Sequence, residues 1–180
     1  MTFTLRPATL ADASALSAFA SQNFPDAAPA VVPRDAVAAF VAASLNEEAV
    51  ARYIKTGAYR FTLAVNQEGE IIAYSGIDTR EPQPAEVPGK AAYLSKFYVG
   101  AEARGTGVSH ALMQAVIDEA CATGHDGLHL GTHRENYRAQ KFYEKNGFVK
   151  VGTRQFELAA GICGDDFIYH LPIPKEGMIS

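Results

Sequence analysis

Apolar positions in the first third of the chain switch between strand and helix spacing. Residues 3–6 predict a short strand, and residues 9–12 carry the Thr and Asp of a capping box, which predicts a helix start. The buried face of that helix is expected to consist of Leu16, Phe19 and Ala20. A loop of small residues is then predicted by Pro25, Pro29 and Pro33. A second amphipathic helix, continuing unevenly toward Ile54, is indicated by Val37, Phe40, Val41 and Leu45.

The remainder of the chain alternates between predicted strands and helices. Apolar runs at residues 60–65 and 71–78 flank Asn66-Gln67-Glu68-Gly69, which is typical of a hairpin. Residues 79–90 include three prolines and predict a mobile connection. The later predicted elements are a strand at 94–99, a helix at 108–122 ending at Gly124, a strand at 128–132, and two strands at 148–156 and 167–171 around an irregular turn at 161–164.

Length and composition are those of one domain spanning residues 1–180. A chain of 180 residues with 48% hydrophobic content can bury a sizeable core, about 70% of the surface of the unfolded chain. No apolar run approaches the roughly 20 residues of a membrane span, and the first residues lack the basic start and apolar middle of a signal peptide. We therefore expect a cytoplasmic protein with no membrane partner.

Charge and cysteine content narrow the range of partners. The net charge is −4, and no basic stripe with interleaved aromatic residues occurs, which argues against a nucleic-acid partner. Cys121 and Cys163 lie far apart and have neither metal-binding nor redox spacing, which predicts reduced thiols.

A glycine-rich corner joins the predicted strand at 94–99 to the predicted helix at 108–122. Gly105 and Gly107 lack Cβ atoms, so the backbone can approach a ligand, and the first N–H groups of the helix have no acceptor within it. With the helix dipole these donors favour an anion such as a diphosphate. No Lys-Ser or Lys-Thr follows, and His110 stands where a dinucleotide-binding motif needs a third glycine. By itself the corner can also be a plain turn from strand to helix.

A second motif lies downstream, at residues 136–148. Ala139, Phe142 and Tyr143 occupy one face of a short predicted helix, which Asn146-Gly147 ends with a left-handed residue. Together the two motifs, spanning residues 94–148, resemble the GNAT superfamily of acyl-CoA-dependent N-acetyltransferases. The resemblance implies an α/β fold with a central mixed, mostly antiparallel sheet, containing a splayed parallel strand pair and flanked by helices. It also implies acetyl-CoA as co-substrate.

The resemblance assigns roles to particular residues. Backbone amides of the loop would bind the coenzyme A diphosphate: Arg104, Gly105, Thr106, Gly107, Val108 and Ser109. The preceding strand segment would pair its backbone with the pantetheine arm: Phe97, Tyr98 and Val99. The side-chain amide of Asn136 would hold the same arm. Glu102 departs from the family, which usually has Gln or Arg three residues before the first loop glycine, and a carboxylate beside phosphates would weaken binding.

Acetyl transfer requires loss of a proton from an ammonium ion and return of a proton to a thiolate. The resemblance places Tyr143 near the sulfur, and a phenol with a pKa of about 10 is protonated at neutral pH, so Tyr143 is the expected general acid. Alternatively, Tyr143 only anchors its helix. A backbone N–H at residues 97–99 would stabilise the oxyanion in this family. The sequence does not identify the general base. The candidates are a water chain and five carboxylates: Asp78, Glu81, Glu86, Asp165 and Asp166.

Three histidines recur at every fourth position, His125, His129 and His133. On a helix they would share one face, but Asp126-Gly127 predicts a turn into a strand, so at most His129 and His133 do so. No Cys or carboxylate is spaced to complete a site, and we predict no metal. By the family resemblance, His133 can instead line the acceptor cleft.

The acceptor is expected to be a small-molecule amine. Residues 151–156, followed by Asp165-Asp166-Phe167, are similar to the tail of bacterial spermidine and spermine N-acetyltransferases, which favours an aliphatic amine such as a polyamine. Two alternatives remain: acetylation of a protein N-terminus or lysine, and a non-catalytic acyl-CoA-binding module. Dimers are frequent in the family, so a homodimer is also open.

Overall fold

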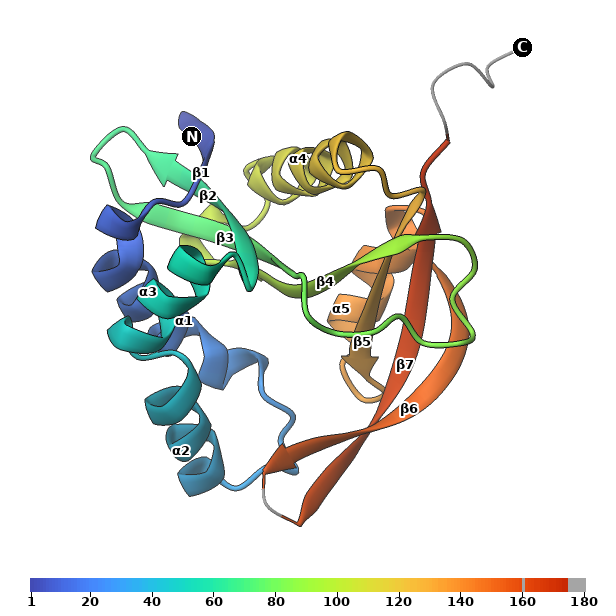
Figure 1. Cartoon of the computed structure of the whole chain (residues 1–180). Helices are drawn as coiled ribbons and strands as arrows, with labels where there is room; N and C mark the ends of the chain where they lie inside the picture. Colours follow the sequence, from blue (N-terminus) through green and yellow to red (C-terminus); the bar gives the residue numbers. More distant parts are fainter. Residues whose placement is uncertain (160, 175–180) are drawn as a thin grey trace. The chain divides into compact units, whose positions relative to one another are not determined.

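The computed structural model describes residues 1–159 and 161–174 of a mixed α/β protein, in which helices flank a sheet (Figure 1). The sheet has seven strands in the order β1-β2-β3-β4-β5-β7-β6. Their bounds are β1 Phe3–Pro7, β2 Tyr59–Asn66, β3 Ile71–Asp78, β4 Ala91–Val99, β5 Gly127–His133, β6 Val149–Ala159 and β7 Ile162–Pro172. Strands β4 and β5 form the parallel pair, and the predicted fold class is confirmed.

Two compact units make up the chain. The first contains Met1–Arg80 and Ser95–Val116, and the second contains Glu81–Leu94 and Ile117–Ser180. The helices are α1 Ala13–Ala27, α2 Arg34–Ser44, α3 Glu47–Thr56, α4 Val108–Ala122 and α5 Tyr137–Lys145, and short 3₁₀ turns lie at Leu10–Asp12 and Ala101–Ala103. Strand β4 and helix α4 contribute residues to both units.

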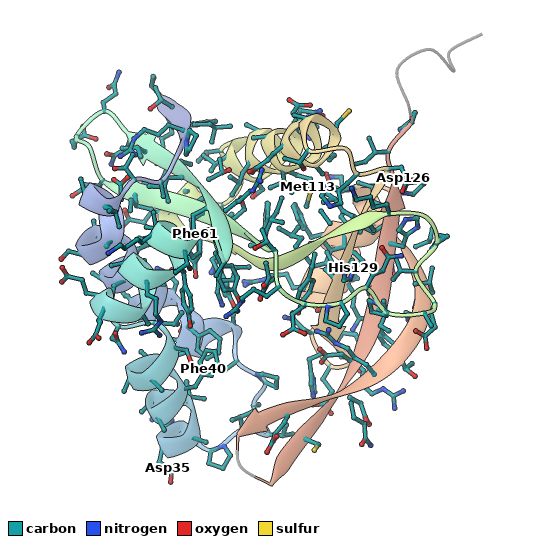
Figure 2. The ribbon with its side chains drawn as sticks, in the orientation of Figure 1. Asp35, Phe40, Phe61, Met113, Asp126 and His129 are labelled. Atoms are coloured by element: carbon teal, nitrogen blue, oxygen red, sulfur yellow. The ribbon has the colours of Figure 1, made fainter. Side chains whose placement is uncertain are left out.

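The first unit has apolar side chains packed on both faces of its strands. Leu63 and Ala64 are consecutive residues of β2 and therefore point to opposite faces, yet both are fully buried. On one face, Leu63 and Tyr74 pack with residues of α1 and α3, and the side chains of this core, including Phe61, are drawn in Figure 2. On the other face, Ala64 packs with the start of α4.

Two details of the N-terminal helices differ from the sequence prediction. Pro25 was expected in a loop but lies inside the last turn of α1, where its missing N–H removes at most one helical hydrogen bond. The helix expected to continue toward Ile54 is divided into α2 and α3, because Asn46 caps α3 and its Oδ1 accepts from the Ala49 N–H at 2.8 Å. By contrast, the capping interaction of Thr9 with Asp12 is present, although it begins a 3₁₀ turn before α1.

The second unit is built on β5, β7 and β6. Helix α5 packs on one face of these strands, where Tyr143 lies edge-on to Phe148 at 5.4 Å between ring centroids. The Tyr169 hydroxyl donates to Glu144 at 2.9 Å and ties β7 to the same helix. Strand β7 begins at Ile162, so most of the stretch predicted as an irregular turn at 161–164 is paired strand.

Within the described residues, no helix is both long enough and apolar enough to cross a membrane. Cys121 and Cys163 are exposed and free.

Candidate active site

The glycine corner of the first unit has the conformation that its composition predicts. Gly105 and Gly107 adopt φ values of 76° and 90°, a left-handed region that residues with a Cβ rarely adopt. A Cβ built on either residue would meet no atom within 4 Å. The glycines therefore serve the backbone conformation and leave open space beside it, rather than making room for another part of the protein.

Backbone donors follow directly at the start of α4. The first hydrogen bond of the helical type runs from the Ala111 N–H to the Gly107 carbonyl at 3.1 Å, so the N–H groups of residues 108–110 precede the helical ladder. Thr106 is bonded within the loop, because its hydroxyl donates to the Ala103 carbonyl at 2.6 Å and its N–H points to the same oxygen at 3.4 Å. Of the predicted loop donors, two amides are therefore already engaged by the protein, that of Thr106 and that of Arg104, whose N–H donates to the Ala101 carbonyl at 3.4 Å.

The two charged residues of the corner are both exposed. Arg104 is exposed and its Nε donates to the Val99 carbonyl at 3.3 Å, which keeps the guanidinium beside the loop. Glu102 is exposed on the 3₁₀ turn Ala101–Ala103. Both side chains are in solvent, where a carboxylate is screened and its effect on a bound phosphate is weakened.

Strand β4 carries the predicted arm-binding segment. Phe97 and Val99 pack into the core beneath α4, and Tyr98 stacks on Tyr74 at 5.4 Å between ring centroids on the opposite face. The pairing of β4 with β5 covers Ala91–Tyr93, so the predicted segment lies beyond the part of β4 that pairs with β5, while β3 is the neighbour of β4 on its other side.

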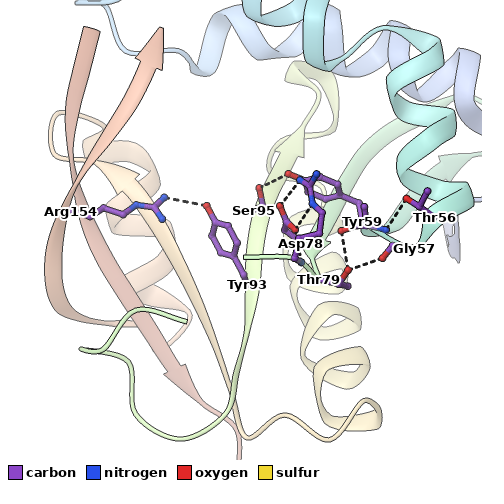
Figure 3. Close-up of polar contacts among 10 residues, drawn as sticks. Thr56, Gly57, Tyr59, Asp78, Thr79, Tyr93, Ser95 and Arg154 are labelled. Carbon is purple, nitrogen blue, oxygen red and sulfur yellow. Dashed lines mark hydrogen bonds and ion pairs between the residues drawn. The ribbon is translucent and has the colours of Figure 1, made fainter. Parts of the chain in front are cut away.

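A polar cluster lies at the ends of β2 and β3 in the same unit (Figure 3). The Asp78 carboxylate is buried, and both of its oxygens accept hydrogen bonds from the Arg80 guanidinium, at 3.1 and 2.9 Å. Burial pushes the pKa of Asp78 upward, but the hydrogen bonds from Arg80 outweigh it and hold the pKa below its usual value. Asp78 is therefore a weak base whose oxygens are already occupied.

Lys96 on β4 belongs to this cluster and was missed by the sequence reasoning. Its ammonium lies over the ring of Tyr59, 5.2 Å from the centroid. Burial lowers the pKa of Lys96 to about 8, against the attraction of Asp78. The only signal in the sequence was one cation within an otherwise apolar run, at residues 94–99.

In the second unit, the predicted residues of α5 have clear structural roles. Asn136 is the N-cap of α5, and its Oδ1 accepts from the Ala139 N–H at 3.2 Å. Tyr143 is partly buried, and its ring contacts Phe142, Phe148 and Tyr169. Gly147 has a φ of 92° and ends the helix segment as predicted.

The second unit has its own polar cluster, on the sheet face that carries Tyr93 and His129. The Arg154 guanidinium donates to the Tyr93 hydroxyl at 3.2 Å and to Asp166 at 3.4 Å. Burial raises the pKa of Asp166, and Arg154 only partly offsets it. His129 is buried and stacks on Tyr93 with 4.9 Å between the ring centroids, and burial lowers its pKa to about 4. His129 is therefore neutral at physiological pH.

The remaining candidate bases, Asp165, Glu81 and Glu86, are more exposed than Asp78 and Asp166. Asp165 forms a half-exposed ion pair with Arg134 at 3.7 Å, and Glu81 and Glu86 are exposed. His129 and His133 lie on one face of β5. His129 is in register with Tyr93 on β4, and His133 is in register with Asp166 on β7. His125 precedes the strand, and its ring forms a hydrogen bond with the Thr123 hydroxyl. No group of three or more metal-ligating side chains is found among residues 1–159 and 161–174.

Comparison with known proteins decides the family. The model of the acetyltransferase (GNAT) domain matches residues 27–163. The chain belongs to the GNAT acetyltransferase family. As a member of it, the protein is an N-acetyltransferase that uses acetyl-CoA.

Relatives and solved structures agree with this assignment. Uncharacterised N-acetyltransferases of Mycobacterium tuberculosis and Mycobacterium bovis are 36% identical to this acetyltransferase over 151 residues, which cover 84% of the chain and 92% of the relative. The PaiA N-acetyltransferase of Thermoplasma acidophilum, solved in complex with coenzyme A, has a TM-score of 0.71 and 17% identity over 96% of this chain and 99% of its own. The ribosomal-protein-S5-alanine acetyltransferase of Vibrio fischeri has a TM-score of 0.70 and 16% identity, and the match covers 100% of this chain and 97% of its own. At these identities the two structures show the shared fold.

Proposed function

We propose that this acetyltransferase moves the acetyl group of acetyl-CoA to the primary amine of a small molecule. The observation that carries the coenzyme part of the proposal is the glycine corner of the first unit. Gly105 and Gly107 hold a left-handed backbone with open space beside them, and the N–H groups that begin α4 precede its hydrogen-bond ladder. A diphosphate matches this arrangement in charge and in its demand for donors.

The proposed contacts of the coenzyme involve the loop, strand β4 and the start of α5. The amides of Gly105 and of residues 107–109 bind the diphosphate, while Thr106 supports the turn through Ala103. The backbone of residues 97–99 pairs with the pantetheine arm. Since the Oδ1 of Asn136 caps α5, its Nδ2 is the part of the amide that donates to the arm.

The proposed chemistry is direct transfer. The amine nitrogen attacks the thioester carbonyl carbon, the carbon–sulfur bond breaks, and the Tyr143 hydroxyl gives its proton to the departing thiolate. A backbone N–H of residues 97–99 stabilises the oxyanion formed on the way. Because Asp78 and Asp166 both bind an arginine, we assign removal of the ammonium proton to a water chain rather than to either carboxylate.

Other acceptors are separate candidates. A polyamine is a candidate on the pattern of residues 151–156 and Asp165-Asp166-Phe167 alone, and a protein N-terminus or lysine is the main alternative. A non-catalytic acyl-CoA-binding module is less suited to this chain, because such a module would have no use for the hydroxyl of Tyr143.

An acceptor panel tests the proposal. Release of free thiol from acetyl-CoA is measured with simple alkylamines, amino acids, spermidine, and peptides with free or blocked N-termini. The proposal predicts release with at least one small amine and none with peptides. Release with peptides alone would assign the protein-modifying alternative, and binding of acetyl-CoA without release for any acceptor would assign the non-catalytic one.

A further inference from the structure

We propose that the acceptor amine also carries an anionic group, a carboxylate being the simplest, and that Lys96 binds this group. The inference rests on the proposed function, because it concerns the acceptor of the same reaction. It is carried by the position of Lys96 and by the distribution of charge around it.

Lys96 lies on β4 beside the segment to which the proposed function assigns the reaction. It immediately precedes the segment 97–99 that is proposed to hold the pantetheine arm, and it shares a strand face with Tyr98. Gly76 of β3 makes room for it, because a Cβ at that position would lie 3.3 Å from the Lys96 Cβ and 3.1 Å from the Phe61 ring. The aliphatic stem is thus packed against the sheet, while the side chain as a whole is partly exposed.

The ammonium of Lys96 has no anionic partner in the described part of the chain. The contact recorded for it is the face of the Tyr59 ring, at 5.2 Å. Asp78, the carboxylate whose charge acts on it, has both oxygens bonded to Arg80. The Arg80 guanidinium also lies over the Tyr59 ring, at 5.1 Å. Around Tyr59 there are therefore two cations and one occupied anion.

This arrangement favours an incoming anion. Burial disfavours the charged form of Lys96 and lowers its pKa to about 8, so at neutral pH most molecules still carry a poorly solvated ammonium. A substrate carboxylate would replace the missing partner with a charge-assisted hydrogen bond. A polyamine would bring a further cation toward Lys96 and Arg80, which is unfavourable at such distances.

The experiment uses amine pairs that differ in a carboxylate: alanine and ethylamine, leucine and 3-methylbutylamine, 4-aminobutyrate and butylamine. The ratio of kcat/KM within each pair is measured by thiol release for the unmodified protein, Lys96→Met, Lys96→Arg and Lys90→Met. Lys90 is an exposed lysine just before β4 and controls for the loss of one positive charge. Comparing ratios at one pH removes the effect of the different amine pKa values, because these are the same for every variant.

In at least one pair, the carboxylate-bearing amine is expected to react at least about tenfold better with the unmodified protein and with Lys90→Met. Lys96→Met should lower that ratio by about tenfold relative to the unmodified protein, and Lys96→Arg should keep part of it. Thermal unfolding should show that Lys96→Met is no less stable, since it removes a cation without an anionic partner. If Lys96→Met does not fold, Lys96→Gln replaces it.

Three results would overturn the inference. They are a preference for the uncharged member of every pair, a preference for spermidine over all of them, and a ratio in Lys96→Met that equals the ratio in the unmodified protein. Each of these leaves amine acetylation itself intact. By contrast, no thiol release with any amine would contradict the proposed function from which the inference starts.

Discussion

The guanidinium of Arg154 on β6 lies directly against the backbone of Gly131 on β5. A Cβ at Gly131 would overlap the Nη2 atom of Arg154. Strand β7 separates β5 and β6 in the sheet, so the arginine side chain reaches across one strand to Gly131 and to the Tyr93 hydroxyl. The absence of a side chain at Gly131 is therefore what allows Arg154 to occupy this position.

Gly131→Ala should consequently destabilise the protein through Arg154. Forcing a methyl group into an occupied position typically costs about 1–3 kcal/mol, and urea unfolding measures that cost. In an Arg154→Met background, the flexible thioether can move aside, so the same glycine substitution should cost much less. An equal cost in both backgrounds would show that the glycine is needed for a reason other than Arg154.

Gly107→Val should abolish or severely weaken coenzyme A binding. The valine side chain would occupy the open space beside the loop, and the left-handed φ of 90° would be strained. Isothermal titration with coenzyme A measures the loss.

Gly124→Val is the matched control for Gly107→Val. Gly124 has a φ of 80° and also no atom within 4 Å of a built Cβ, but it follows the other end of α4. Both variants should lose similar stability, whereas only Gly107→Val should lose binding. Equal binding by the two would mean that the glycine corner is no more than a turn.

Tyr143→Phe should lower kcat by about a hundredfold to ten-thousandfold, because the ring remains packed on Phe148 while the proton donor is lost. Steady-state thiol release measures turnover, and the KM for acetyl-CoA should change little. Tyr137→Phe is the control on the same helix, since Tyr137 is 68% exposed. Turnover of Tyr143→Phe within about threefold of the unmodified protein would remove the general-acid role.

Acid stability should depend on His129. Its pKa is about 4 in the folded protein, below the ordinary 6.5, so the unfolded chain binds the proton first as the pH falls. The stability contributed by neutral His129 is complete above pH 6.5 and is lost as the pH falls toward 4. His129→Phe keeps the stacking on Tyr93 and should remove on the order of 2 kcal/mol of the stability loss between about pH 7 and about pH 4.5.

Urea unfolding at both pH values measures this effect. His110→Phe, at an exposed position, should leave the acid-induced loss unchanged. An identical loss in His129→Phe and the unmodified protein would mean that His129 is not the group that titrates. His170, whose pKa burial also lowers, would then be the next residue to replace.

Local patterns were sufficient to predict most of the elements. The helix at 108–122 and the hairpin around Asn66–Gly69 coincide with α4 and with β2 and β3, because spacing and turn residues act within a few positions of the chain. Pro25 was misplaced because the local sequence does not show the packing of the last turn of α1, in which Phe24 stacks on Phe40.

The polar clusters could not be predicted in the same way. Lys96 contacts Tyr59, and Arg154 contacts Gly131, because the order and register of the strands bring together residues that are far apart in the sequence. Likewise, the sequence predicted Asp78 as a candidate base but could not show that both of its carboxylate oxygens accept hydrogen bonds from Arg80. Resemblance to a family assigned roles to the loop and to Tyr143, but it did not predict the charged side chains around Tyr59.

A crystal structure with coenzyme A bound would test the central claim most directly. The account predicts the diphosphate within hydrogen-bond distance of the amides of Gly105 and of residues 107–109, with the Thr106 amide still directed to Ala103. Coenzyme A bound elsewhere, or a corner whose amides have closed onto protein oxygens, would contradict it.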